Sequence, residues 1–241
     1  MQNFMRQHPL AFIVIAQLFG TPLWFSINGI WISLSNDLGV SESTLGLFTL
    51  MVQAGFITGT LCIAVTGFAD QFKASRIFTV ASVLGAIVNA GFVFTAGSIH
   101  LSLILRFLTG ICLAGIYPIG MKLVVSWAPK HTGSALSWLL GMLTLGTALP
   151  HLMRGATFNL VWQWPLLISS ALALLGGILI LVLGDGPHLP DSIQKAHLFE
   201  GLSALKFPEF RAIAGGYFGH CWELYAFWVL TPLLVTREIT R

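Results

Sequence analysis

Two residues near the C-terminal end of the chain have side chains that exchange protons. His220 and Glu223 are three positions apart in a long apolar stretch, so a helix places both on one face. A carboxylic acid inside a membrane segment is a natural proton carrier, and histidine titrates near neutral pH. The pair predicts a protonation site coupled to transport across a membrane. A structural polar pair is the alternative, and a metal site would need further ligands.

Arg106 is the second candidate, because it also lies inside an apolar run. A charged residue in a membrane segment is costly and usually functional. Few residues of the run 101–126 precede it, so the alternative is an arginine whose side chain extends to the outer membrane surface. Tyr117 lies about three turns further on, on the same helical face. We expect Arg106 to have a functional role.

Polar and aromatic side chains recur at helical spacing in other apolar runs, where they form stripes on single faces. Helices that line a water-filled pathway are expected to carry such stripes. Interhelical hydrogen bonds and interface tryptophans are the alternative explanation. The candidate residues of a substrate pathway are Gln17, Trp24, Asn28, Gln53, Arg106, Tyr117, Thr144, His151 and Arg154.

Membrane-spanning helices must position these side chains. The 241 residues are 56% hydrophobic and 9% charged, with a mean hydropathy of +0.84, whereas about a quarter of a soluble protein is charged. A spanning helix needs about 20 mostly apolar residues. The segments that qualify are 9–33, 44–66, 77–97, 101–126, 134–157, 160–183 and 209–235. The sequence therefore predicts an all-α polytopic membrane bundle with about seven transmembrane helices.

The distribution of basic residues predicts the orientation of these helices. Cytoplasmic loops carry an excess of Lys and Arg, which predicts a cytoplasmic N-terminus. We expect the protein to lie in the plasma (inner) membrane. The residues predicted on the inside are Arg6, Lys73, Arg76, Lys122, Lys130, Lys195, Lys206 and Arg211, and those on the outside are Arg106, Arg154, Arg237 and Arg241. We find no basic patch for nucleic acid, and no Cys or His spacing typical of a metal or cofactor site.

The loop between the second and third predicted spans, residues 66–76, reads TGFADQFKASR. It resembles the loop between helices 2 and 3 of the major facilitator superfamily of transporters, whose motif is roughly Gly-x-Leu-Ala-Asp-Arg-x-Gly-Arg-Arg. Ala69 and Asp70 match, Arg76 closes the basic run, and Thr66, Gln71 and Lys73 depart from the motif. The resemblance implies that Asp70, Lys73 and Arg76 stabilise one state of a transport cycle. A charged turn that only fixes topology is the alternative.

The resemblance extends over the rest of the chain. Arg106 and Gly110 are similar to the Arg-x-x-x-Gly motif of the family's fourth helix, which is linked there to proton coupling or to holding helix ends. The Gly-Pro of the family's antiporter motif is not met, since Leu149 precedes Pro150. The implied organisation is a six-helix bundle over 1–183, a cytoplasmic linker over 184–208, and the first helix of an incomplete second bundle over 209–241.

This resemblance implies a secondary active transporter, not an enzyme, that moves a small solute by alternating access, as a symporter if protons are coupled. The expected substrate is an organic anion, because Arg106, His151 and Arg154 are positive or titratable, or else a drug-like metabolite. One alternative is a truncated fragment that does not transport and lacks a C-terminal half or a second copy. A membrane enzyme is disfavoured because acidic residues are scarce in the spans.

Overall fold

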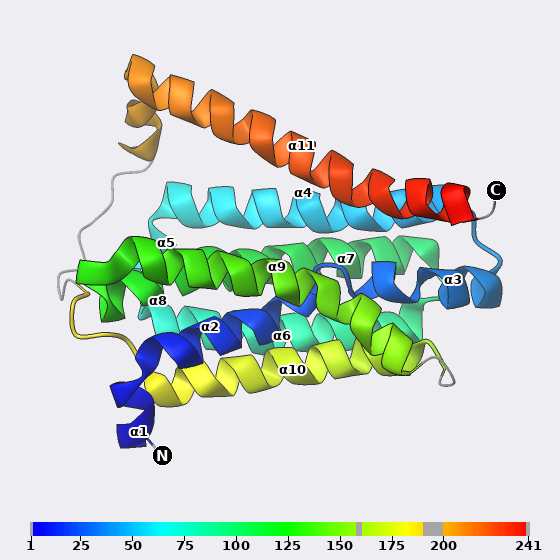
Figure 1. The fold of residues 1–241 in the computed structure, drawn as a ribbon, viewed down its shortest axis with the longest axis horizontal. Helices are drawn as coiled ribbons and strands as arrows, with labels where there is room; N and C mark the ends of the chain where they lie inside the picture. The colour runs from blue at the N-terminus through cyan, green and yellow to red at the C-terminus, as the bar shows by residue number, and fades with distance from the viewer. Residues whose placement is uncertain (1, 158–160, 190–199, 240–241) are drawn as a thin grey trace. The chain divides into compact units, whose positions relative to one another are not determined.

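The computed structural model describes residues 2–157, 161–189 and 200–239 of the chain. Within those residues the secondary structure is helical and contains no strand (Figure 1). The chain divides into two compact units, Met1–Ala196 and His197–Arg241, which we describe separately. Part of the predicted linker, residues 190–199, lies outside the described residues, as does Arg241. The predicted domain boundaries therefore stay predictions.

The helices of the first unit alternate long membrane-length segments with short turns. They are α1 (Gln2–Gln7), α2 (Pro9–Gly20), η1 (Thr21–Leu23), α3 (Ser26–Leu38), α4 (Glu42–Thr66), α5 (Phe68–Gln71), α6 (Ala74–Thr95), α7 (Ile99–Ala114), α8 (Tyr117–Trp127), η2 (Pro129–His131), α9 (Thr132–Ala156) and α10 (Gln163–Leu183). The second unit holds η3 (Glu200–Lys206) and α11 (Pro208–Ile239).

Six segments of the described chain are long and apolar enough to cross a membrane. They are Pro9–Leu38, Ser43–Thr66, Ala74–Thr95, Ile99–Trp127, Pro129–Ala156 and Gln163–Leu183, and we refer to them as spans 1 to 6. They confirm the first six predicted spans. The predicted seventh span corresponds to α11, a continuous helix that is not among the six, because residues such as His220 and Glu223 interrupt its apolar run. Its membrane crossing stays a prediction.

Two of the six spans are broken near their middle. Span 1 passes through the short 3₁₀ turn η1 around Pro22, and α3 begins only at Ser26. Span 4 is interrupted at Gly115 and Ile116, directly before the Tyr117–Pro118 start of α8. Proline lacks the backbone N–H and clashes with the preceding turn, which explains both breaks. The sequence indicated a kink at Pro118, whereas the break in span 1 was not foreseen.

Small residues allow α4 and α7 to pack closely. A Cβ atom added at Gly55 would collide with the Phe107 carbonyl, and one added at Gly110 would collide with the Val52 carbonyl. Gly59 lies one turn beyond Gly55 and faces Ala114 in the same way. Without a hydrophobic driving force between helices in lipid, such close backbone approach is a main source of association. Spans 2 and 4 are therefore held together along a seam of small residues.

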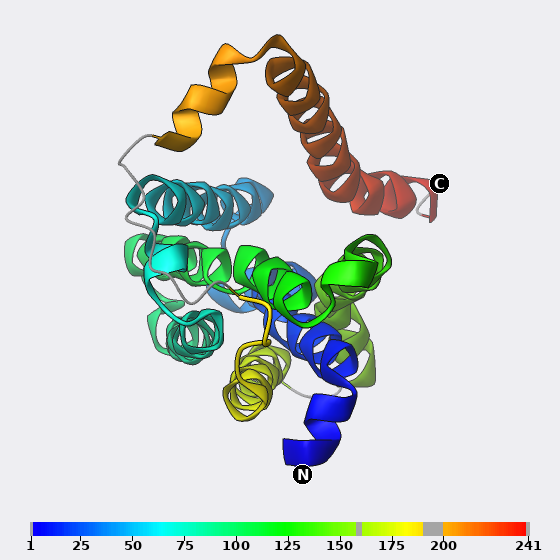
Figure 2. The same cartoon turned by 90° about the vertical axis from the view of Figure 1, so that its left-hand side faces the viewer.

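Span 1 is the centre of the first unit, and spans 2 and 5 lie at its edge. In the most apolar window of each span, 67% of span 1 is buried, against 22% of span 2 and 17% of span 5. The end-on view in Figure 2 places α4 and α10 on opposite sides of this unit. Spans 2 and 5 therefore have the largest exposed surface, which a solute, lipid or another polypeptide segment can contact.

Candidate functional site

Arg106 is enclosed by the broken part of span 1. Its side chain is 1% exposed, and its Nη2 donates to the carbonyl of Trp24 at 2.7 Å. Both Nη1 and Nη2 also donate to the Leu23 carbonyl at 3.3 Å, and Nη1 donates to the Ser26 hydroxyl at 3.1 Å. The break frees carbonyl groups that an unbroken helix would have bonded internally, and the guanidinium satisfies them. Arg106 therefore does not extend to the membrane surface.

Asn89 of α6 extends this contact into a polar layer between four spans. Its Oδ1 accepts from Arg106 Nη1 at 3.1 Å and from the Ser26 hydroxyl at 2.7 Å. Its Nδ2 donates to the Ser170 hydroxyl at 2.9 Å and to the Leu166 carbonyl at 3.3 Å. The hydrogen bonds join spans 1, 3, 4 and 6. All the oxygens that Arg106 contacts in the described part of the chain are neutral, so its charge is solvated by dipoles instead of being paired with a carboxylate.

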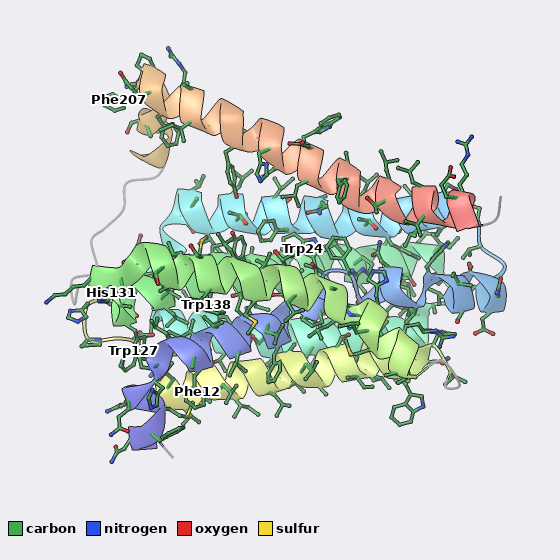
Figure 3. The ribbon with its side chains drawn as sticks, viewed as in Figure 1. Phe12, Trp24, Trp127, His131, Trp138 and Phe207 are labelled. Carbon is green, nitrogen blue, oxygen red and sulfur yellow. The ribbon has the colours of Figure 1, made fainter. Side chains whose placement is uncertain are left out.

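An aromatic cluster lies beside this polar layer, where the two broken spans meet α4. The ring of Trp24 is 4.6 Å from that of Phe56, and the Phe56 ring is 6.4 Å from that of Tyr117 (ring centroids). Trp24 follows η1 and Tyr117 begins α8, so each break supplies one aromatic residue. Figure 3 shows Trp24 midway along the helices. The cluster thus occupies the level at which both spans are interrupted.

Two hydrogen-bond donors in this cluster have no partner in the part of the chain that the structure describes. The indole Nε1 of Trp24 and the amide Nε2 of Gln53 are buried without a hydrogen bond. Gln53 is one turn from Phe56 on α4, and the Trp24 ring contacts the Phe56 ring, so both donors belong to residues next to Phe56. A buried donor without an acceptor costs about 1–3 kcal/mol, so an acceptor at this position would be stabilised.

Two other predicted pathway residues of span 1 make contacts with neighbouring spans. Gln17 is buried and donates from Nε2 to the Thr21 hydroxyl at 3.2 Å, while its Oε1 faces Gly120 of α8 without a hydrogen bond. Asn28 donates to the Thr49 hydroxyl of α4 at 3.4 Å. Together with Trp24, these residues lie between spans 1, 2 and 4. Their role in a substrate pathway stays a prediction.

The predicted pathway residues of span 5 have a different environment. Thr144 is exposed and donates to the Leu140 carbonyl of its own helix, and His151 is exposed. Arg154 donates to the Ser33 hydroxyl of α3 at 2.5 Å. The predicted positive set of Arg106, His151 and Arg154 is thus split between a buried polar layer and the surface of α9.

The charged loop after span 2 is attached to the end of span 4. Lys122 Nζ lies 2.6 Å from Asp70 Oδ1 and donates to the Ala69 carbonyl at 2.5 Å. The Asp185 carboxylate, directly after α10, accepts from the Ser75 amide at 2.6 Å at the start of α6. Sequence analysis missed Lys122 and Asp185 as partners of this loop, because they are distant in the chain. Lys73 and Arg76 are exposed.

The predicted protonation pair lies in the second unit. His220 Nδ1 is 4.0 Å from Glu223 Oε2, at the outer limit of an ion pair, and the two residues are one turn apart on α11. Among the described residues, no group of three or more His, Cys, Asp or Glu side chains is arranged to hold a metal ion. Both side chains are exposed and lie too far apart for a direct hydrogen bond, so a proton would pass between them only through a bridging water.

Comparison with known proteins identifies one family. The family model described as Major Facilitator Superfamily matches residues 13–239. A search of curated proteins found no match. The matched region includes most of span 1, all of spans 2 to 6, the loop at Asp70 and the whole of α11.

Proposed function

The chain belongs to the major facilitator superfamily of membrane transporters, and on that premise we propose that it moves a small solute by secondary active transport. In this proposal the solute is exposed first to one side of the membrane and then to the other. The six described spans form the scaffold, and the loop residues Asp70, Lys73 and Arg76 stabilise one of the two states. The attachment of Asp70 to Lys122 supports that role, since it links the loop to the end of span 4.

The observation that carries the proposal is the pair of breaks in spans 1 and 4. Transporters form solute sites near the middle of the membrane from discontinuous helices, where freed backbone groups and side chains meet. Here the breaks bring Trp24 and Tyr117 to the Phe56 ring of span 2, next to the unpartnered amide of Gln53. A bundle that served only as a membrane anchor has no need of buried donors without acceptors.

Proton coupling is the energy source we propose, which would make the protein a symporter of the plasma (inner) membrane with a cytoplasmic N-terminus. Glu223 with His220 is the proposed proton carrier, because a carboxylate and an imidazole 4.0 Å apart can exchange a proton through one bridging water. Arg106 has only neutral partners among the described residues, which supports a positioning role instead of proton exchange. Its guanidinium remains charged at physiological pH.

Uptake by proteoliposomes that contain the purified protein tests this function. A panel of radiolabelled organic anions and neutral drug-like solutes is offered with and without an imposed pH gradient. We expect saturable uptake of at least one solute, and an increase with the gradient that Glu223→Gln abolishes. Uptake that is linear in concentration and equal to empty liposomes for every solute would favour the alternative, a chain that does not transport on its own.

A further inference from the structure

We propose that Trp24, Gln53, Phe56 and Tyr117 form a subsite for the planar, negatively charged end of an organic solute. The indole N–H and the amide of Gln53 would donate to its carboxylate, and the rings of Phe56 and Tyr117 would contact its flat apolar part. The inference rests on the proposed function, because it assigns a substrate class to the same aromatic cluster.

The unpartnered donors are the first observation. Trp24 is 5% exposed, so water does not reach its indole N–H, and the Gln53 amide nitrogen is buried as well. Buried polar groups nearly always have hydrogen-bond partners, and exceptions often mark functional positions. Both groups are hydrogen-bond donors, so a ligand atom that binds them must be a hydrogen-bond acceptor. A carboxylate is the strongest acceptor of organic solutes, because a charged partner roughly doubles the strength of a hydrogen bond.

The charge balance of the spans is the second observation. Along the six spans, the positive residues are Arg76, Arg106, Lys122, Lys130 and Arg154, whereas the negative residue is Asp37 at the end of span 1. No carboxylate therefore lies near the level of the two breaks in these spans to neutralise a cationic solute. Arg106 instead contributes a positive charge there, and its Nη2 is 2.7 Å from the carbonyl of Trp24.

The packing of the rings is the third observation. Trp24 is buried, whereas Gln53, Phe56 and Tyr117 are half-buried, so the cluster extends from a buried residue to partly exposed ones. Ring centroids separated by 4.6 and 6.4 Å are within the range of aromatic contacts. A flat ligand ring would extend this row of aromatic contacts. The subsite therefore favours an aromatic carboxylate over a compact inorganic anion.

Equilibrium binding to the purified protein in detergent tests the subsite without requiring transport. The probes are radiolabelled benzoate, its neutral isostere benzamide and the cation benzylamine, with cyclohexanecarboxylate as the anion that lacks an aromatic ring. We expect benzoate to bind about tenfold or more tightly than benzamide, since a hydrogen bond to a charged group is about twice as strong as one to a neutral group. Benzylamine should not bind, and cyclohexanecarboxylate should bind more weakly than benzoate.

Matched variants locate the binding. Trp24→Phe keeps a ring but removes the donor, and should weaken benzoate binding about tenfold. Trp31→Phe, the same change at a buried tryptophan of α3 outside the cluster, should leave it unchanged. Gln53→Met removes the second donor and provides an independent test if Trp24→Phe does not fold.

The outcomes distinguish this inference from the proposed function. The subsite is wrong if benzoate shows no saturable binding up to about 10 mM, which is tenfold above the usual upper range of KM values. It is also wrong if benzamide binds equally well, or if Trp24→Phe and Gln53→Met both bind like the wild type. Saturable uptake of another solute would then leave the transport function standing. Selective benzoate binding without uptake would support the subsite and contradict the transport function.

Discussion

Replacing Arg106 by alanine should destabilise the bundle strongly, because the side chain satisfies four oxygen atoms at once. These are the carbonyls of Leu23 and Trp24, the Ser26 hydroxyl and Asn89 Oδ1. Two of the five hydrogen bonds share the Leu23 carbonyl, so we count one for each oxygen. At about 0.6 kcal/mol for each oxygen, the average inside membrane proteins, the loss totals about 2.4 kcal/mol. The carbonyls left buried without a donor add to this value, because an unsatisfied buried polar group costs about 1–3 kcal/mol.

We therefore expect a loss of about 3 kcal/mol in the free energy of unfolding. For a chain of this length, about 2–4 °C per kcal/mol predicts a melting midpoint lower by about 6–12 °C. The measurement is thermal melting of the detergent-purified protein, followed by the loss of the monodisperse peak in size-exclusion chromatography. Arg106→Lys keeps the charge but offers one nitrogen in place of a planar fork, so its midpoint should lie between those of the wild type and the alanine variant.

Arg76→Ala is the matched control, because Arg76 is an exposed arginine of span 3. Its effect should stay within about 0.5 kcal/mol. An Arg106→Ala protein that melts within 2 °C of the wild type, on the order of 0.5–1 kcal/mol, would refute the structural role of the polar layer. The role would also be refuted if Arg106→Lys and Arg106→Ala had the same melting midpoint and Arg76→Ala lowered the midpoint equally. Burial of Arg106 would then not explain the loss of stability.

Three further predictions concern the seams of the first unit, and each is measured as a change in melting midpoint. Gly55→Leu should cost several degrees because its Cβ collides with a backbone carbonyl of α7, whereas Gly46→Leu, on an open face of the same helix, should be neutral; equal midpoints would contradict the close packing. A double-mutant cycle with Asp70→Asn and Lys122→Ala should give a coupling of about 0.2–1 kcal/mol, since the pair is partly exposed; a coupling above about 3 kcal/mol would require a buried pair instead. Asn89→Ala should lose about 1–3 kcal/mol by leaving buried groups unsatisfied, and an unchanged midpoint would show that Asn89 does not connect the spans.

Hydropathy and proline positions were sufficient to predict most of the fold. The six spans follow from long apolar runs. An apolar segment that crosses a bilayer must satisfy its backbone groups internally, so it forms a helix. Pro118 signalled the irregularity of span 4, and the break at Gly115 and Ile116 directly precedes its helix. Pro22 carries the same signal in span 1, and the 3₁₀ turn η1 could have been predicted from it.

The environment of Arg106 could not be predicted, because its partners come from other spans. The sequence shows an arginine a few residues into an apolar run, which fits a surface position and a buried one equally well. Burial is decided by Asn89 and Ser26, which are 17 and 80 positions away. The attachment of Asp70 to Lys122 spans 52 positions and escaped prediction for the same reason. The periodicity of one helix indicates which of its own faces is buried, but not which face of another helix packs against it.

The contacts of Arg106 also bear on the order in which the chain is made. A lone arginine at the centre of an inserting helix carries a penalty of about 2.5–3.5 kcal/mol. Its acceptors come from Leu23, Trp24, Ser26 and Asn89, all of which precede it in the chain. By the time span 4 leaves the ribosome, spans 1 and 3 have already been synthesised, and their free oxygens can receive the guanidinium as it enters the bilayer. Span 6 then supplies Ser170 and Leu166 to Asn89 and completes the layer last.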